Sequence, residues 1–286
     1  MHKFIPWVGK HILRLSYDIT VFTNGSGDTT YDYVVVFTIA VLATSGTVLW
    51  SVLDRKRTHY NRLYYWLTVA VRFYVALMLI NYGLIKVIKL QFPAPGLYRL
   101  TQNYGDSSPM GLAWTFLGFS KGYNFLMGMA EIAAVFLLFR RTMIFGAIIT
   151  TVATVNVMAI NYFYDVPVKI LSTALFVMTL FLLLNGAGRL SRFFFTGKSV
   201  SLPVIKAPAI NRRWLRIAKI SLKTLIIGYA LIYGTIETWG SKKQYGEDAP
   251  KPKFYGIYDV GIFIKNNDTL PPLMTDPVRW KQFLIQ

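Results

Sequence analysis

The 286-residue sequence contains no cysteine and only three histidines, His2, His11 and His59. The lack of cysteine excludes disulfides, thiol nucleophiles, thiolate metal sites and iron–sulfur clusters. None of the histidines lies inside the long apolar segments described below, so a haem held by two intramembrane histidines is excluded as well. A redox role would therefore require a diffusible carrier or a partner subunit.

Charge is also scarce. Charged residues make up 15 % of the sequence and hydrophobic residues 54 %, whereas a typical soluble domain is roughly 25 % charged. In a soluble protein, the net charge of +18 would suggest a nucleic-acid partner. Next to long apolar runs, the basic residues are better explained by loops that set membrane topology and contact anionic lipid headgroups. Composition therefore favours a polytopic membrane protein whose partner is the lipid bilayer and not nucleic acid.

Six apolar segments are long enough to cross a hydrocarbon layer of about 30 Å as helices. We expect these spans at 33–53, 64–88, 118–139, 142–163, 168–187 and 218–238. Helices are expected because backbone groups in lipid must find their hydrogen bonds within the protein. The sequence thus predicts an all-α membrane protein with six transmembrane helices.

Basic residues are concentrated in alternate loops. Thirteen Lys and Arg residues lie in the loops on one side, at 54–63, 140–141 and 188–217. The short loops of the other side, 89–117 and 164–167, contain only Lys89 and Arg99. The positive-inside rule places the first set in the cytoplasm. We therefore expect a multi-pass protein of the bacterial cytoplasmic membrane with both termini outside the cytoplasm.

The two ends of the chain are expected to lie outside the membrane core. Residues 1–32 begin with an amphipathic stretch that includes Ile5 and Val8, which favours an interfacial helix. In the tail, residues 239–286, alternating apolar and polar residues around Asn266–Asn267 predict strands and a turn. So short a tail forms a poor core of its own, so we expect it to dock on the bundle or on a partner.

Two charged residues lie within the predicted spans at similar depth. Counted along the helices, Arg72 and Glu131 are both about 12 Å from the cytoplasmic face. A charge near the bilayer centre costs roughly 2.5–3.5 kcal/mol, so we expect Arg72 and Glu131 to form an intramembrane ion pair with a structural role. In the alternative, Arg72 extends to the membrane interface and Glu131 is neutral or bonds to a Ser or Thr hydroxyl.

Uncharged polar residues gather in the opposite half of the spans. By the same count, Asn81, Asn124 and Asn156 lie about 20–26 Å from the cytoplasmic face. Together with Tyr82 and Lys86 they would line a polar cleft that opens outward and attracts an anionic headgroup or an oxyanion. We favour the simpler interpretation that these residues make ordinary hydrogen bonds between helices, each worth about 0.6 kcal/mol, and keep the cleft as the second hypothesis. Gly128 is expected to allow its helix to approach a neighbouring helix closely.

The outer-face turn YDVPVK places Asp165 and Lys169 four residues apart around Pro167. We expect a helix start with a surface ion pair there. A further alternative is an enzyme that acts on a lipid-linked substrate, with Asp165 or Glu131 as the acid. The sequence shows no nucleophile–base pair, phosphate-binding glycine loop or metal-ligand spacing, so no catalytic or metal site is predicted.

A series of motifs between residues 64 and 186 points to a family. These motifs are Arg72 followed by Gly83 and Lys86, the loop QFPAP, the helix GMAEIAAVFLLF with Gly128 and Glu131, and the basic turn Arg140–Arg141. In this order they resemble the DoxX family of bacterial four-helix membrane proteins. The strings YGDSSPMGLAWTF, LFRRT and YDVPVK are similar to a larger subgroup with an added helix at each end and a tail that continues beyond the position of Gln286.

The resemblance implies a division of the chain and a role. A DoxX-like four-helix core would occupy 64–187, with an added helix and basic loop at 33–63, a basic loop at 188–217 and a last helix at 218–238. The family takes its name from a subunit of a thiosulfate:quinone oxidoreductase, which implies an accessory subunit or scaffold beside a quinone-linked redox system. Quinone and another membrane redox subunit are thus expected by resemblance alone. The alternative is a binding or transport module for a small anion or lipid headgroup.

Overall fold

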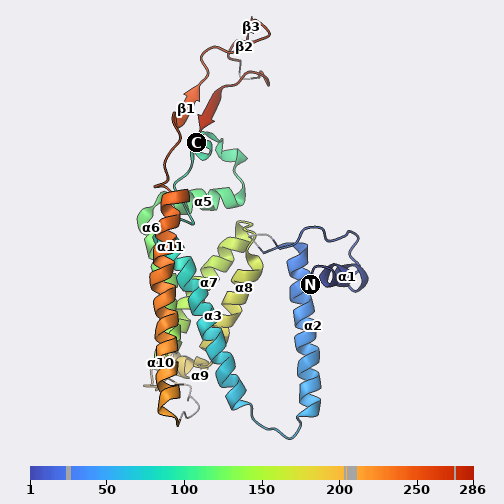
Figure 1. Ribbon diagram of the computed structural model, residues 1–286, viewed down its shortest axis with the longest axis vertical. Helices are drawn as coiled ribbons and strands as arrows, with labels where there is room; N and C mark the ends of the chain where they lie inside the picture. The colour runs from blue at the N-terminus through green and yellow to red at the C-terminus, as the bar shows by residue number, and fades with distance from the viewer. Residues whose placement is uncertain (24–26, 203, 205–210, 274) are drawn as a thin grey trace.

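The computed structural model describes residues 1–23, 27–202, 204, 211–273 and 275–286. The molecule is mostly helical, with a small β region beyond one end (Figure 1). Four helical segments are long and apolar enough to cross a membrane: α2 (Thr30–Leu53), α3 (Asn61–Val87), α6 with the 3₁₀ segment η2 (Lys121–Leu138) and α7 (Met143–Phe163). A fifth candidate is a bent pair of helices, α8 (Lys169–Leu184) and α9 (Ala187–Thr196). All five overlap segments that the sequence predicts to span.

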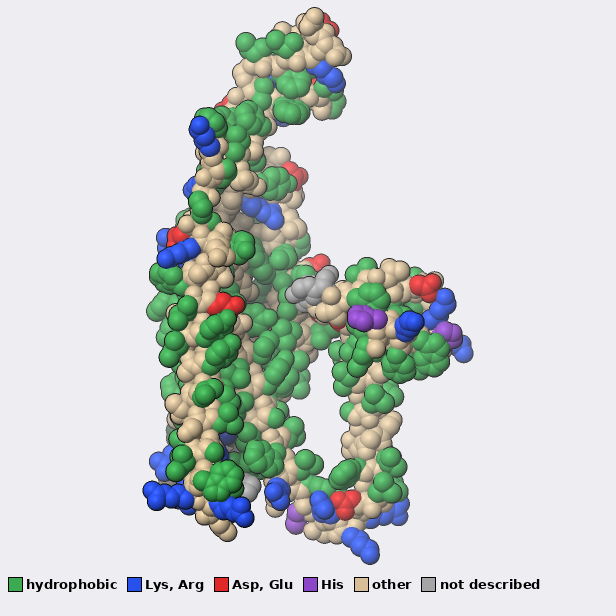
Figure 2. Space-filling model, viewed as in Figure 1, with side chains coloured by type: hydrophobic (Ala, Val, Ile, Leu, Met, Phe, Trp, Pro, Cys, Tyr) green, Lys and Arg blue, Asp and Glu red, His purple; other side chains and the backbone are tan. Residues whose placement is uncertain are grey.

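A four-helix bundle of α3, α6–η2, α7 and α8 forms the centre of the molecule (Figure 1). Its core is made of aliphatic side chains with almost no exposed surface, among them Val75, Leu79, Ile80, Leu137, Ala147 and Leu182. α3 packs most extensively on α6, and α7 on α8. Outside this core the helices present further apolar side chains, which Figure 2 shows as a broad band over the length of the bundle.

The fifth predicted span, 168–187, is shorter in the structure than expected. The helix ends at Leu184, and the chain bends by 70° into α9, which begins at the last residue of the predicted span and continues into the predicted loop 188–217. Asn185 explains the break, because its Nδ2 donates to the carbonyls of Phe181 and Leu182, which would otherwise stay unpaired at the helix end.

The sixth predicted span, 218–238, is part of a long rod outside the bundle. The rod consists of α10 (Arg213–Gly228), a π-helical turn η3 (Tyr229–Tyr233) and α11 (Gly234–Tyr245). Within the described residues the rod is not among the helices that pass as candidate spans. The π-helical turn divides the rod into α-helices of 16 and 12 residues, each shorter than the roughly 20 residues that cross a bilayer, which is the reason for this difference from the prediction.

The N-terminal part stands apart from the bundle. α2 is joined to α3 by a basic loop, and within the described residues its extensive helix contacts are limited to α1 (Phe4–His11) (Figure 1). α1 matches the expected N-terminal helix, and its buried side chains Ile5 and Val8 pack on Tyr31 and Val34 of α2. Thr29 caps α2 through a reciprocal pair of hydrogen bonds with Asp32, a typical capping box.

The tail forms two small antiparallel sheets, as the sequence predicts. β1 (Gly256–Asp259) pairs with β4 (Gln282–Ile285), and β2 (Ile264–Lys265) pairs with β3 (Asp268–Thr269). Asn266 and Asn267 connect β2 and β3 with φ angles of 53° and 66°. A two-residue hairpin with both central residues at positive φ favours asparagine, so this prediction is confirmed.

The two ends of the bundle differ in composition. The end that faces the strands is covered by α4 (Leu97–Thr101), η1 (Tyr104–Asp106) and α5 (Pro109–Phe119). We call it the tail end. At the opposite end, near the start of α10 and the loop between α2 and α3, Figure 2 shows a concentration of Lys and Arg side chains. We call it the basic end.

Candidate functional site

The site begins at a close crossing of α3 and α6. A Cβ atom on Gly83 would lie 2.7 Å from the carbonyl oxygen of Gly128, and one on Gly128 would lie 2.6 Å from that of Gly83. Only glycine fits at both positions, so the two backbones touch. The prediction that Gly128 allows close helix approach is confirmed. One turn further along each helix lie Lys86 and Glu131.

Lys86 and Glu131 form a buried ion pair beside this crossing. The Lys86 Nζ lies 2.6 Å and 2.7 Å from the two carboxylate oxygens of Glu131. The side chains are only 6 % and 4 % exposed, so the pair is removed from solvent. Because side chains lean toward the N-terminus of their own helix, the two residues lean toward each other from antiparallel helices. The charges neutralise each other within the core.

The expected Arg72–Glu131 pair is not formed. Gly83 lies against Ile132 and Gly128 against Val87, which sets Glu131 level with the turn of α3 that holds Lys86. Arg72 lies about 21 Å closer to the basic end along α3. The depth count placed residues 64 and 139, the predicted inner ends of the two spans, at one level, whereas the crossing places Gly83 beside Gly128 and Ile132. The longer rise of the 3₁₀ segment 133–138 accounts for only about 3 Å of the difference.

Arg72 has a different buried partner. Its Nε donates to the carbonyl oxygen of Leu137 at 2.6 Å, and the residue is 2 % exposed. Leu137 belongs to the last turn of η2, where carbonyls lack partners within the helix. Arg72 therefore caps the end of the α6–η2 segment.

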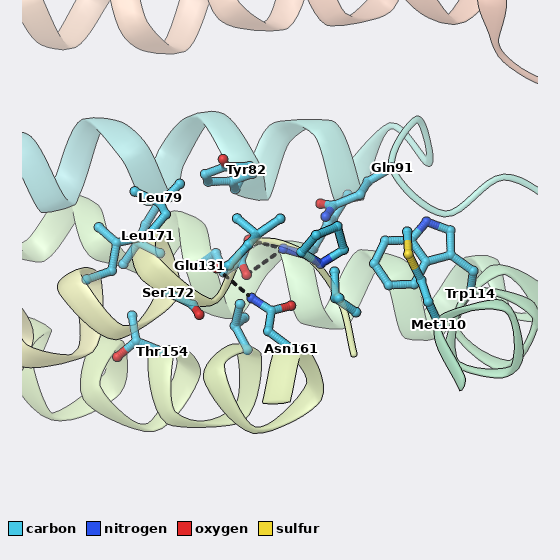
Figure 3. A pocket seen from close by; sticks show the side chains of 16 residues that line it. Leu79, Tyr82, Gln91, Met110, Trp114, Glu131, Thr154, Asn161, Leu171 and Ser172 are labelled. Atoms are coloured by element: carbon cyan, nitrogen blue, oxygen red, sulfur yellow. Dashed lines mark hydrogen bonds and ion pairs between the residues drawn. The ribbon is translucent and has the colours of Figure 1, made fainter. Parts of the chain in front are cut away.

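A cavity of about 290 Å³ opens next to the ion pair, and we call it the central cavity. Figure 3 shows side chains from five helices that converge on it: Leu79 and Tyr82 of α3, Met110 and Trp114 of α5, Glu131 of α6, Thr154 and Asn161 of α7, and Leu171 and Ser172 of α8. α5 closes the cavity toward the tail end. Most of the wall is apolar, and the polar groups are few.

A second cavity of about 500 Å³ lies on the other side of the ion pair, toward α6 and α7. The two cavities share Lys86, Gln91, Trp114, Glu131, Val157 and Asn161. The ion pair is thus a partition between two apolar spaces, with polar atoms available from either side.

The predicted polar cleft is only partly formed. Tyr82 and Lys86 line the central cavity, and Asn156 lines the second one. Asn124 is fully buried at the junction of α5 and α6, where its Nδ2 donates to backbone carbonyls. Asn81 is exposed and lines a different cavity, between α3 and the α10–α11 rod. The distance along each helix identifies residues at the same depth in the membrane, but it does not show whether their side chains point to the same cavity.

Gln91 offers the cavities an unused acceptor. Its Oε1 and the Oδ1 of Asn124 are the buried side-chain polar atoms without a hydrogen-bond partner in the part of the chain that the structure describes. Across the central cavity, the Nδ2 of Asn161 donates to the carbonyl of Val168 at 3.3 Å. A lysine ammonium has three N–H donors, and two of those of Lys86 face Glu131. Lys86 thus leaves one donor for a ligand, and Gln91 leaves one acceptor.

Lys89, at the end of α3, binds the tail. Its Nζ lies 2.5 Å from the Glu247 carboxylate, which also accepts the backbone N–H of Ala94 at 2.7 Å. Burial alone would raise the pKa of the Glu247 carboxyl. The hydrogen bonds from Lys89 and Ala94 lower the pKa by more than burial raises it, so the pKa lies below its usual value. This contact holds the end of α11 against the loop that follows α3.

The outer-face turn contains the expected surface pair. Lys169 and Asp165 form an ion pair at 2.5 Å, as predicted. The helix cap comes from elsewhere, because the Asp28 carboxylate accepts the backbone N–H groups of Lys169 and Ile170. A carboxylate at this position satisfies free donors and favours the helix dipole. Asp28 thereby joins the N-terminal part to the bundle.

Sequence reasoning misses several residues of the site. Gln91, Met110 and Trp114 follow α3 in a predicted loop, and only the tertiary structure folds them over the cavity. The buried pairing of Lys86 had one sequence signal, its spacing from Gly83, which equals that of Glu131 from Gly128. Among the described residues, no group of three or more His, Asp or Glu side chains converges in a way that could hold a metal ion.

Comparisons with known proteins show a relative of one part of the chain. No family model matches the chain, and no solved structure matches it. Over 115 residues, which are 39 % of this chain and 71 % of the relative, the sequence is 41 % identical to the protein named "Uncharacterized protein YwoB" of Bacillus subtilis (strain 168). An identity this high over most of the relative is a family relationship. The chain therefore belongs to the family of YwoB.

Proposed function

We propose that this chain is a DoxX-like accessory protein of the bacterial cytoplasmic membrane that binds a quinone in the central cavity. The observation that carries the proposal is the buried Lys86–Glu131 pair between two apolar cavities. A site of this kind presents hydrogen-bonding atoms without net charge, which suits a neutral lipophilic ring.

The residues of the cavity fit such a molecule. The two cavities have sizes typical of small-molecule sites, which run from roughly 300 to 1,000 Å³. Trp114 and Tyr82 supply aromatic walls, the free N–H of Lys86 would donate to a ring carbonyl, and Gln91 Oε1 would accept a ring hydroxyl. A bound quinone supplies two-electron chemistry, and the chain would bind the ring, orient it and exclude water.

The alternative, a binding module for a small anion, has less support. It relied on Lys86 and Lys89 as free cations near the tail end. Lys86 is paired with Glu131 and Lys89 with Glu247. With both charges neutralised, an anion entering from the tail end would gain little electrostatic energy.

The proposal includes six spans with both termini outside. The α10–α11 rod is long enough to cross a bilayer, and the basic end carries the described parts of the loops that the positive-inside rule assigns to the cytoplasm. Because the sequence has no cysteine, a single cysteine placed at residue 286 can be labelled selectively. We expect a membrane-impermeant maleimide to label it from outside. Labelling only from the cytosol would reject the sixth span.

Quinone binding is tested on the purified protein in mild detergent. We expect short-chain benzoquinone or naphthoquinone to raise the melting temperature of the wild-type protein. Trp114→Ala should lose most of this shift, whereas Phe119→Ala, a control on the same helix with an 83 % exposed ring, should keep it. No shift with either quinone, or equal loss in both variants, would reject the proposed site.

A further inference from the structure

A third cavity, of about 620 Å³, lies on another face of α3, between this helix and α10. We call it the inner groove. Its apolar wall comes from both helices and from the end of η2, and includes Tyr65, Val69, Phe73, Leu77, Leu138 and Ile226. Trp66 and Leu222 at its edge are 55 % and 60 % exposed. In a membrane, such an edge opens toward the lipid.

The charge of the inner groove is of one sign. Arg72, Arg140, Lys219 and Lys223 line it, and no Asp or Glu is among the described residues that do so. Lys223 Nζ lies 4.0 Å from the centre of the Phe139 ring, and Arg72 is nearly inaccessible to water. Several cations beside an apolar wall repel one another, and burial makes the repulsion stronger. The groove therefore has the composition of a site for an anion with an apolar part.

The groove lies in the half of the bundle that leads to the basic end. Lys219 and Lys223 are on successive turns of α10, about 9 Å and 15 Å from Arg213, where the helix begins. A lipid phosphate near the membrane surface is within reach of such long side chains, which extend toward the interface. Basic pockets between helices at this depth are typical sites for anionic lipid headgroups.

We propose that the inner groove binds an anionic phospholipid from the leaflet at the basic end. Its phosphate would lie among Arg72, Lys219 and Lys223, and an acyl chain would lie along Phe73 and Ile226. The lipid would complete the contact between α10 and α3 and attach the rod to the bundle. This site is independent of the central cavity, because the two share no residue.

The test is native mass spectrometry of the full chain in mild detergent with added phosphatidylglycerol or phosphatidylcholine. We expect the wild-type protein to retain phosphatidylglycerol selectively. The double variant Lys219→Gln/Lys223→Gln should weaken this retention roughly tenfold or more, given the usual contribution of a basic residue near an anionic lipid. The matched control is Arg213→Gln/Arg216→Gln, which removes the same charge from α10 outside the groove and should have little effect.

Ile226→Trp tests the apolar half without a change of charge. It should fill the groove and reduce phosphatidylglycerol retention while the surface charge stays the same. Equal loss in the Arg213/Arg216 control would show general surface attraction and overturn the proposal. Retention of phosphatidylcholine equal to that of phosphatidylglycerol would also overturn the proposal. So would stabilisation against heat by inorganic phosphate alone that is as strong as that by phosphatidylglycerol.

Discussion

Helix α3 carries two buried basic residues that the structure satisfies in different ways. Lys86, near the tail end, has a carboxylate partner in Glu131, so its charge is neutralised within the chain. Arg72, closer to the basic end, has the Leu137 carbonyl as its hydrogen-bond partner and lines a groove with other cations. One helix thus separates two kinds of site. One is neutral and suits an uncharged ligand, and the other is positive and suits an anionic lipid.

The largest effect is expected at the neutralised site. Lys86→Met or Glu131→Gln leaves the other group buried without its partner, so we expect the free energy of unfolding to fall by about 3–5 kcal/mol. The measurement is unfolding in mixed detergent micelles. Asp165→Asn removes the exposed pair with Lys169 and serves as the control, with an expected loss of about 0–1 kcal/mol. Equal losses in core and surface variants would contradict the account.

A substitution in the positive site should lower the free energy of unfolding by less. Arg72→Met leaves the Leu137 carbonyl without its donor, for which we expect a loss of about 2 kcal/mol in the same assay. The variant also removes a charge that has no carboxylate beside it in the groove, which offsets part of the cost. A loss larger than that of Lys86→Met would reverse the comparison.

A substitution at the crossing of α3 and α6 should weaken ligand binding at the neutral site but not at the positive one. Gly128→Ala places a Cβ atom 2.6 Å from the Gly83 carbonyl oxygen, so the helices must separate at a cost of about 1–2 kcal/mol. The quinone-induced shift should decrease as well, whereas phosphatidylglycerol retention should not. The control is Gly46→Ala in α2, where a Cβ meets no atom within 4 Å and helix propensity favours alanine. Full stability in Gly128→Ala would argue against the close crossing.

The smallest effect concerns the tail and depends on pH. The folded-state pKa of Glu247 lies below its usual value of 4.5, so its contact stabilises the docked tail above that pH. The stabilisation is lost as the pH falls from 4.5 through the lowered pKa. Proteolysis of the tail should therefore increase at low pH, and in Glu247→Gln it should be faster and lose this dependence. A wild-type rate that stays constant below pH 4.5 would contradict the contact.

Local patterns predict the helices and the tail hairpin, but not which helix faces meet. The long apolar runs and the Asn266–Asn267 turn are signals within short segments, so the structure agrees with them. The partner of Glu131 depends on the register between α3 and α6, which the Gly83–Gly128 crossing sets, so counting along the sequence selects Arg72 instead of Lys86. The contacts of Lys89 with Glu247 and of Asp28 with α8 join distant segments, and no local pattern indicates them.

The central claim is that Lys86, and not Arg72, is the partner of Glu131. Two double-mutant cycles test it in mixed detergent micelles, one with Lys86→Met and Glu131→Gln and the other with Arg72→Met and Glu131→Gln. We predict a coupling energy of about 2–3 kcal/mol in the first cycle and none in the second, since only residues in contact couple strongly. Strong coupling between Arg72 and Glu131, with additive losses for Lys86 and Glu131, would contradict the account.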